Sequence, residues 1–366
     1  MPERKTIPCS WRYLASRLKS RLIAMIPLVA RMIRGRPDGR KSPRGPGGAM
    51  TPSVGIMIEG QEGLTWERWR ALARAVEGGG YESLFRSDHL TGLFGEPRRA
   101  ALDTWASLTW LATGTSRIRF GPLVCPLTFY HPALLAKRAA AVDQLSGGRL
   151  DLGVGAGWHE PEHRMYGIPF PSMRERLDRL ECGVRVIRAL GQGRPVTLAQ
   201  PYYPLVEAES YPLPAHGHLP LIVGGRGEKR TLRIVAEHAD EWNTTRLTFE
   251  EYAARCSVLA EHCRAVRRDP ATIRRSLMVP VIVGRSASET AARLEKARAI
   301  FPRLPEDAAG WRGAGFLHGS PADVVADLGR WRELGVQRVM LQMIDQEDLA
   351  AIELIAREVL PALGSR

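Results

Sequence analysis

The sequence has few cysteines and lacks any segment long and apolar enough to cross a membrane. Its five cysteines are odd in number, and none of them forms a Cys-x-x-Cys pair or a zinc-finger spacing. We therefore expect neither a disulfide framework nor a zinc finger, and a reducing, cytoplasmic location. The apolar stretch 22–30 is interrupted by Pro27 and is too short to span a bilayer, so stable membrane insertion is not expected.

Negative charge is scarce at the N-terminus. The formal net charge of the chain is +13, and residues 1–50 contain twelve Lys or Arg residues against two acidic ones. The rest of the chain is close to neutral, which argues against a nucleic-acid groove in its body. We expect residues 1–50 to form a basic, disordered or loosely helical extension, with a membrane-surface helix as the alternative. Residues 51–366 are expected to form the folded domain.

From residue 53 onward, short apolar or β-branched runs alternate with amphipathic helical stretches, which is typical of a parallel sheet with crossover helices. The expected strands are 53–58, 81–87, 117–124, 150–155, 219–223, 240–243, 277–284 and 337–343. The expected helices are 65–79, 103–113, 132–145, 173–190, 228–239, 249–267, 287–300, 321–334 and 349–363. Eight such units predict an α/β fold with a single (β/α)8 TIM barrel, and an open doubly wound sheet is the alternative.

The fourth and fifth expected strands are separated by more than sixty residues, far more than an ordinary barrel connection. One helix, 173–190, is predicted inside this insertion. The remainder, through the Pro- and Tyr-rich stretch 201–220, is interpreted as a lid or a substrate wall.

Functional residues of such a barrel are expected at the carboxyl ends of its strands. Asp88 and His89 follow the second strand. A carboxylate beside an imidazole can fix the ring's tautomer and hold a proton-handling group over a ligand. The alternative is that Asp88 caps the next turn and His89 is incidental.

Glycine-rich segments end the third and fourth strands. The cluster 121–126 marks either a backbone next to a ligand or a simple turn. In 153–158, Gly-Val-Gly-Ala-Gly-Trp, alternate glycines leave one face without side chains, so a flat ring could approach the backbone with Trp158 as its wall. The helix and the acidic residue that complete a dinucleotide fingerprint do not follow convincingly.

Residues 159–163 spell His-Glu-Pro-Glu-His, the pattern of zinc proteases. That pattern binds zinc only on a continuous helix. Proline is tolerated in the first helical turn alone, so Pro161 places His159 at or before the N-cap. We therefore expect no metal site.

The fifth strand ends in 224–227, Gly-Gly-Arg-Gly, just before an expected helix. Glycine amides at a helix N-terminus form a phosphate site, and Arg226 or Lys229 would add positive potential. The alternative is a glycine-rich turn without a ligand.

These blocks together resemble the luciferase-like monooxygenase superfamily, and most closely its branch of oxidoreductases that depend on the deazaflavin coenzyme F-420 (F420). The similarity runs from Ser53 to the C-terminus. The segments that carry it are 87–89, 121–126, 131–133, 145–150, 153–158, 166–170, 224–227 and 240–243.

The resemblance implies a barrel whose mouth holds the cofactor ring, with Asp88 and His89 beside the reactive centre. It also implies a non-proline cis peptide between Leu123 and Val124, behind the ring. Gly155 to Trp158 would border the ring and its tail, and the 224–227 segment would take the phosphate. The implied cofactor-binding residues are Asp88, His89, Leu123, Val124, Gly155, Gly157, Trp158, Gly224, Gly225, Arg226 and Gly227.

The expected activity is hydride transfer between F-420 and a small organic substrate, with His89 as proton donor or acceptor and Asp88 fixing its orientation. The alternatives are a monooxygenase that uses reduced flavin mononucleotide (FMN) and oxygen, and a non-catalytic cofactor-binding protein. Sugar-phosphate dehydrogenases of this family carry Glu where Trp158 stands and Trp where Leu93 stands, so that substrate class is not expected. The oligomeric state is left open, with a homodimer as one option.

The separation of charge generates a first prediction. Deleting residues 1–49 should leave the melting temperature and the cofactor affinity of the protein unchanged, because the basic segment is expected to add nothing to the core. Thermal melting of the full and shortened chains tests this, and a large drop in melting temperature would show that the extension packs on the barrel.

Overall fold

The computed structural model describes residues 51–94 and 98–364, so the predicted extension lies outside the described residues. In the described part, ten strands form one sheet and two more form a hairpin. The strands of the sheet are β1 (Ser53–Ile58), β2 (Ser83–Arg86), β3 (Arg119–Pro122), β4 (Cys125–Pro126), β5 (Leu152–Gly155), β8 (Leu221–Gly224), β9 (Glu241–Thr245), β10 (Arg274–Val283), β11 (Leu317–Gly319) and β12 (Arg338–Met343).

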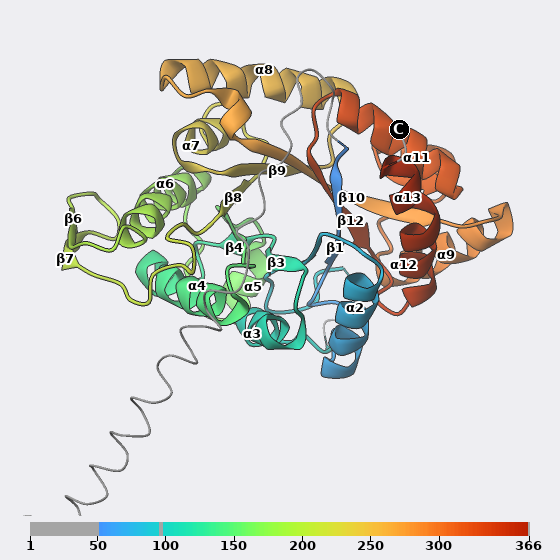
Figure 1. The fold of residues 1–366 in the computed structure, drawn as a ribbon, viewed down its shortest axis with the longest axis horizontal. Helices are drawn as coiled ribbons and strands as arrows, with labels where there is room; N and C mark the ends of the chain where they lie inside the picture. Colours follow the sequence, from blue (N-terminus) through green and yellow to red (C-terminus); the bar gives the residue numbers. More distant parts are fainter. Residues whose placement is uncertain (1–50, 95–97, 365–366) are drawn as a thin grey trace, which may run out of the picture. The chain divides into compact units, whose positions relative to one another are not determined.

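Helices surround this sheet (Figure 1). They are α2 (Trp66–Gly78), α3 (Thr104–Gly114), α4 (Pro132–Ser146), α5 (Glu160–Met165), α6 (Met173–Leu190), α7 (Thr231–His238), α8 (Phe249–Ala265), α9 (Ala287–Ile300), α10 (Ala308–Gly313), α11 (Pro321–Glu333), α12 (Leu349–Leu354) and α13 (Leu360–Gly364). Single turns are η1 (Pro270–Thr272), of 3-10 type, and η2 (Ile355–Val359), of π type. The β6–β7 hairpin (Val196–Leu198, Leu205–Ala208) projects at the left of Figure 1.

The sheet closes on itself as a barrel. Its strand order is β3-β2-β1-β12-β10-β9-β8-β5-β4, and the pairings around this path are parallel. Strands β3 and β4 are two parts of one barrel strand. A bridge between Phe120 and Leu150 joins β3 to the start of β5, which completes the ring of eight strands. The prediction of a (β/α)8 TIM barrel is confirmed.

Helix ends follow the local sequence where a side chain can cap them. Thr65 accepts a hydrogen bond from the amide of Arg68, and Asp103 accepts one from Ala106. Gly147 ends α4 in the left-handed conformation. The predicted helix 228–239 begins later than expected, at Thr231, because residues 228–230 form a turn.

Several short elements were missed by the sequence prediction. The insertion after β5 contains α5 and the β6–β7 hairpin in addition to the predicted helix α6. Beyond β10, helix α10 and the three-residue strand β11 were also missed, and β11 extends the sheet by pairing with β10. The two missed helices have six residues each, which is less than two turns and too short to show a helical period.

The amino-terminal end of the barrel is closed by an ion network around Arg338, the first residue of β12. This side chain is fully buried, and its guanidinium lies 2.9 Å from Asp151 Oδ2, 3.0 Å from Glu241 Oε2 and 2.6 Å from Glu82 Oε1. Burial alone would raise the pKa of Asp151, but Arg338 and Arg119 hold it below its ordinary value. The network makes this end a structural plug, and ligand sites of such barrels lie at the opposite, carboxyl end of the strands.

Within residues 51–94 and 98–364, no helix has the length and apolarity that a bilayer span requires.

The plug gives a stability prediction. Arg338→Met should lower the free energy of unfolding by about 3–5 kcal/mol, because it removes the close partner of buried Glu241. Arg274→Met is the control: Arg274 reaches Glu241 at 3.7 Å, but its side chain is 45% exposed, so the expected loss is below about 1 kcal/mol. Urea unfolding measures both, and equal losses would contradict a buried plug.

Candidate active site

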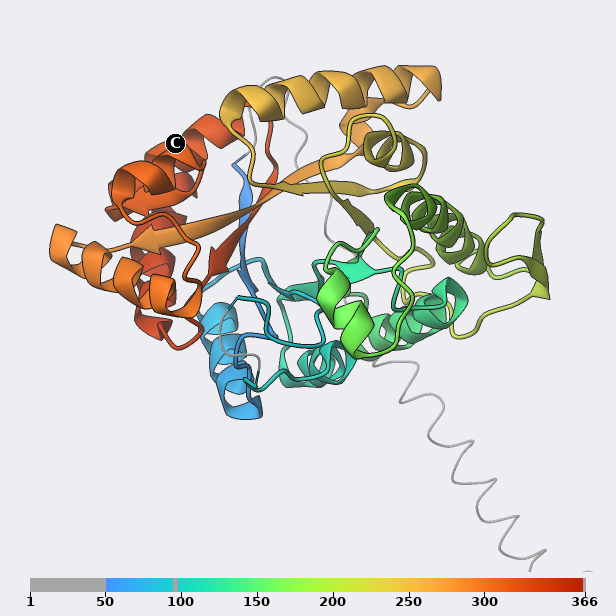
Figure 2. The same ribbon diagram turned by 180° about the vertical axis from the view of Figure 1, so that it is seen from behind.

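The residues singled out by the sequence gather at the carboxyl ends of the barrel strands. His89 follows β2, the Leu123–Val124 peptide separates β3 from β4, and Trp158 follows β5. Helix α5 lies in front of the strands in Figure 2, where it is drawn in bright green. The loop after β2 and the insertion after β5 therefore meet over the barrel mouth.

His89 is held by a carboxylate that the sequence analysis did not assign to it. Its Nδ1 lies 2.7 Å from Glu162 Oε1, and the second oxygen of Glu162 accepts the amide of Leu90 at 3.0 Å. A carboxylate only accepts, so Nδ1 carries the proton. Among the described residues Nε2 has no hydrogen-bond partner, which leaves it for a ligand. The side chains of His89 and Glu162 are 13% and 2% exposed, so this pair is well shielded from water.

The surroundings of His89 favour its protonated form. Burial lowers the pKa of His89, but the hydrogen bond and the charge of Glu162 oppose burial, and Glu59 and Asp88 add to them. The pKa of His89 therefore lies above its ordinary value of 6.5. The raised pKa favours a proton on Nε2 when Nδ1 is bonded to Glu162.

Asp88 does not orient His89, and the interpretation that it does is wrong. The Oδ2 atom of Asp88 accepts a hydrogen bond from the Tyr130 hydroxyl at 2.9 Å. Burial, together with the charge of Asp88, raises the pKa of Tyr130 far above its ordinary value, so Tyr130 stays a donor. Asp88 thus acts on His89 only as a nearby charge, while Glu162 supplies the contact.

The His-Glu-Pro-Glu-His segment serves to position Glu162. His159 is the N-cap of α5, as Pro161 predicts, so it stands outside the helix. His163 faces inward: its Nδ1 lies 2.7 Å from the carbonyl oxygen of His159, and its Nε2 lies 2.8 Å from Thr128 Oγ1. Nε2 of His163 therefore ties α5 to the loop after β4, whereas Nδ1 holds the first turn of α5 itself. In the described part of the chain, no group of three His, Cys, Asp or Glu residues could hold a metal ion.

The peptide between Leu123 and Val124 is cis, as the resemblance implies. The glycines nearby make room for the side chain of Val124. A Cβ on Gly155 would lie 2.7 Å from Val124 Cγ2, and one on Gly224 would lie 2.9 Å from Val124 Cγ1. The expected bare glycine face of β5 is therefore covered by Val124, and a ring at this position meets Val124 first.

A second buried carboxylate lies beside His89 at the mouth. Glu59, just after β1, accepts hydrogen bonds from the side-chain amides of Gln61 (2.9 Å) and Gln342. Gln61 in turn accepts the hydroxyl of Ser87 at 2.5 Å. This network fixes the loops after β1 and β2 relative to each other, and the sequence analysis missed it because its members lie far apart in the chain.

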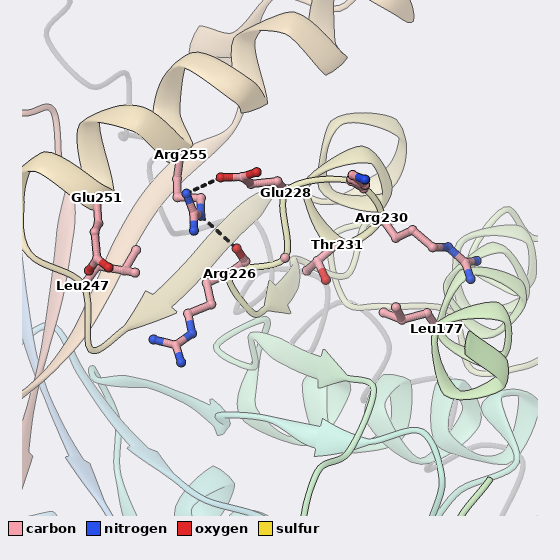
Figure 3. A pocket seen from close by; sticks show the side chains of 10 residues that line it. Leu177, Arg226, Glu228, Arg230, Thr231, Leu247, Glu251 and Arg255 are labelled. Carbon is pink, nitrogen blue, oxygen red and sulfur yellow. Dashed lines mark hydrogen bonds and ion pairs between the residues drawn. The ribbon is translucent and has the colours of Figure 1, made fainter. Parts of the chain in front are cut away.

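A pocket of about 660 Å³ lies beside the turn between β8 and α7 (Figure 3). Arg255 pairs with Glu228, and Arg230 points away toward α6, where it pairs with Asp178. Within the described part of the chain, the side chain of Arg226 donates only to the carbonyl of Arg246, at 3.1 Å. The residues that line the pocket are Leu177, Arg226, Gly227, Glu228, Lys229, Arg230, Thr231, Leu247, Glu251 and Arg255.

The possible phosphate-binding groups of this pocket differ in whether they already have a hydrogen-bond or ion-pair partner. No partner for the ammonium group of Lys229 occurs among residues 51–94 and 98–364. The amide of Gly225 already donates to the carbonyl of Asn243 at 3.0 Å, so it is not a free donor for a phosphate as the sequence suggested. Of the 224–227 segment, Arg226 and Gly227 line the pocket, whereas Gly224 belongs to the sheet and packs on Val124.

Residues 47–338 match the luciferase-like monooxygenase family. The chain belongs to this family. Among curated members, it is 28% identical over 232 residues to the F420-dependent hydroxymycolic acid dehydrogenase of Mycobacterium tuberculosis. It is also 36% identical over 178 residues to the F420-dependent glucose-6-phosphate dehydrogenase of Nakamurella multipartita. The matched segments cover 63% and 48% of this chain, and 63% and 50% of those two relatives.

Solved structures of other proteins share the fold. An F420-dependent secondary alcohol dehydrogenase in complex with an F420-acetone adduct superposes with a TM-score of 0.72 at 20% identity, covering 86% of this chain and 99% of that one. The oxygenating constituent of 3,6-diketocamphane monooxygenase from Pseudomonas putida, in complex with FMN, gives 0.69 at 18% identity, covering 85% and 99%. Proteins that share this fold thus include one in complex with an F420-acetone adduct and one in complex with FMN.

The luciferase-like site yields a prediction about Glu162. Glu162→Gln should lower the pKa of His89, because the amide keeps the shape of the side chain but removes the charge that favours the imidazolium. Titration of the His89 Cε1 proton by NMR measures this without any assay of activity. Glu160→Gln, an exposed position on the same helix, is the control and should leave the pKa unchanged. An unchanged pKa in Glu162→Gln would remove Glu162 from this role.

Proposed function

We propose that the protein is an F420-dependent oxidoreductase that transfers hydride between the deazaflavin and a small organic substrate, with His89 handling the accompanying proton. The observation that carries the proposal is the buried Glu162–His89 pair, in which Nδ1 is engaged and Nε2 has no hydrogen-bond partner among the described residues. The F420-dependent dehydrogenases among the curated relatives support the same cofactor.

The residues at the mouth fit such a cofactor. Asn243 points into the barrel, since its amide reaches the sulfur of Met340, and Thr245 shares that face two residues later. The hydroxyl of Thr245 is buried without a hydrogen-bond partner, so it can serve a polar ring edge. The unpaired Lys229 and the neighbouring Arg226 provide the positive potential that a phosphate requires.

Proton handling falls to the chain itself. When bound, the deazaflavin supplies or accepts the hydride. In the reducing direction, His89 gives the proton on Nε2 to the substrate oxygen, and in the oxidising direction it takes that proton back. Glu162 keeps Nδ1 protonated in both states, so the ring always presents the same nitrogen to the substrate. Asp88 and Glu59 stabilise the imidazolium from a greater distance.

A monooxygenase that uses reduced FMN is the second candidate function, and the FMN-bound relative supports it. Both cofactors would present a flat ring to the mouth and a phosphate to Lys229. A protein that only carries the cofactor is a third possibility, but it would have no use for a buried carboxylate aimed at an imidazole.

Two variants separate chemistry from cofactor binding. His89→Ala should lower turnover by about a hundredfold or more, the usual effect of losing a general acid or base, with little change in affinity. Lys229→Glu should weaken F420 binding by about tenfold, because it places a like charge against the phosphate. Fluorescence titration of the purified protein with F420 and with FMN measures affinity, and single-turnover absorbance measures hydride transfer.

The outcomes are distinct. Tighter binding of FMN than of F420, with oxygen consumed during turnover, would favour the monooxygenase. Loss of binding in both variants would make His89 a cofactor contact. Unchanged turnover in His89→Ala would remove this histidine from the mechanism.

A further inference from the structure

The proton that His89 handles in the proposed function must be exchanged with water after each turnover. Resting on that function, we infer that His159 relays protons between water and Nε2 of His89. The side chain of His89 is only 13% exposed, and its Nδ1 is bonded to Glu162. Exchange at Nε2 therefore needs a second titratable group that lies close to the ring and reaches water.

The carboxylates around His89 do not provide this exit. The acidic groups that act on the ring are Glu162, Glu59 and Asp88, and all three are buried. Glu162 holds Nδ1 of the ring and a backbone amide, and Glu59 accepts hydrogen bonds from two glutamine amides. Asp88 accepts the hydroxyl of Tyr130. A proton passed from Nδ1 to Glu162 would therefore stay within the buried pair.

His159 lies beside His89 and is open to water. The two imidazole rings meet edge-to-face, with their centroids 6.3 Å apart. A direct hydrogen bond between the rings would bring the centroids closer together, so one bridging water fits this spacing. His159 is half-buried, and within the described part of the chain neither of its ring nitrogens is buried or has a hydrogen-bond partner.

The surrounding residues hold this pair of rings side by side. The indole of Trp158 packs edge-to-face on both, with centroid distances of 5.7 Å to His89 and 5.0 Å to His159. His159 is the N-cap of α5, and its carbonyl oxygen lies 2.7 Å from Nδ1 of His163. The main chain of His159 is thus fixed by His163, while its side chain is left free to exchange protons.

The charges at the site favour transfer from His159 to His89. Burial lowers the pKa of His159; Glu162 opposes this, whereas the charges of His89 and His163 lower the pKa further. The pKa of His89 is raised, so His89 is the stronger base and receives a proton that His159 takes from water. Once His89 has given its proton away, its charge no longer opposes protonation of His159. The relay is then reloaded when a proton is needed.

Only N–H and O–H bonds change in the relay. In the reducing direction, a ring nitrogen of His159 takes a proton from hydronium or a buffer acid. The bridging water passes a proton to Nε2 of His89, which has given its own to the substrate. The oxidising direction reverses these steps, and no electrons pass through His159.

The test measures proton exchange at His89 without substrate or cofactor. In protein labelled with ¹³C at histidine Cε1, relaxation dispersion at the midpoint of the His89 titration gives the rate at which the ring gains and loses its proton. His159→Gln should slow this rate by about tenfold or more. The remaining rate should rise with buffer concentration, because buffer molecules must then reach His89 themselves.

A matched variant and a rescue separate the relay from a structural effect. His131→Gln is the control: His131 is an exposed histidine whose ring meets Tyr203 at 5.2 Å, and its loss should leave the rate unchanged. In His159→Ala, added imidazole should restore the rate, whereas the bulkier buffer HEPES at the same concentration should not. The pKa of His89 should stay above its ordinary value in all of these variants, since the contact with Glu162 is retained.

The relay and the proposed function fail in different ways. If F420 does not bind, the proposed function fails, whatever the exchange rate at His89. If F420 binds and His89→Ala lowers turnover, but His159→Gln exchanges protons at His89 as fast as the native protein, the relay is wrong. Equal slowing in His131→Gln, or slowing in His159→Ala that imidazole does not reverse, would also overturn it.

Discussion

A buried carboxylate needs hydrogen-bond donors to offset the loss of water. At the mouth of this barrel, the loop after β2 provides them to Glu162. The two oxygens of Glu162 take the Nδ1 proton of His89 and the amide of Leu90, so one side chain fixes both the proposed catalytic ring and the start of the loop after it. Helix α5 exists at this place because His163 ties it to Thr128. Losing either donor would leave charge in a shielded site at considerable cost.

The two ends of the barrel use buried charge for opposite purposes. At the amino-terminal end, Arg338 pairs with three carboxylates in one compact buried cluster. At the mouth, carboxylates outnumber the cations in contact with them, and the surplus acts on His89. The buried charges at the amino-terminal end thus stabilise the fold, whereas those at the mouth favour the protonated form of His89.

The repeating part of the fold could be predicted from the sequence, because short apolar runs alternate regularly with amphipathic helical stretches along the chain. Asp88 and His89 were placed correctly at a strand end, but their partners were not. Glu162 lies 73 residues from His89 in the chain, inside a segment whose spacing imitates a zinc motif, and only the fold brings the two together. Because Asp88 is next to His89 in the chain, the sequence analysis assigned the orienting role to Asp88 instead. The glycines of β5 were misinterpreted in a similar way, since the residue that fills their space, Val124, lies between β3 and β4.

The position of Val124 among those glycines limits how relatives of this chain can diverge. A methyl group added at Gly155 or Gly224 would collide with the valine, so a larger residue can be accepted at either site only after position 124 has become smaller. Substitutions at these sites are therefore expected to be ordered in time and to occur together in descendants. The residues at positions 124, 155 and 224 are therefore expected to change together in related sequences, although they lie far apart in the chain.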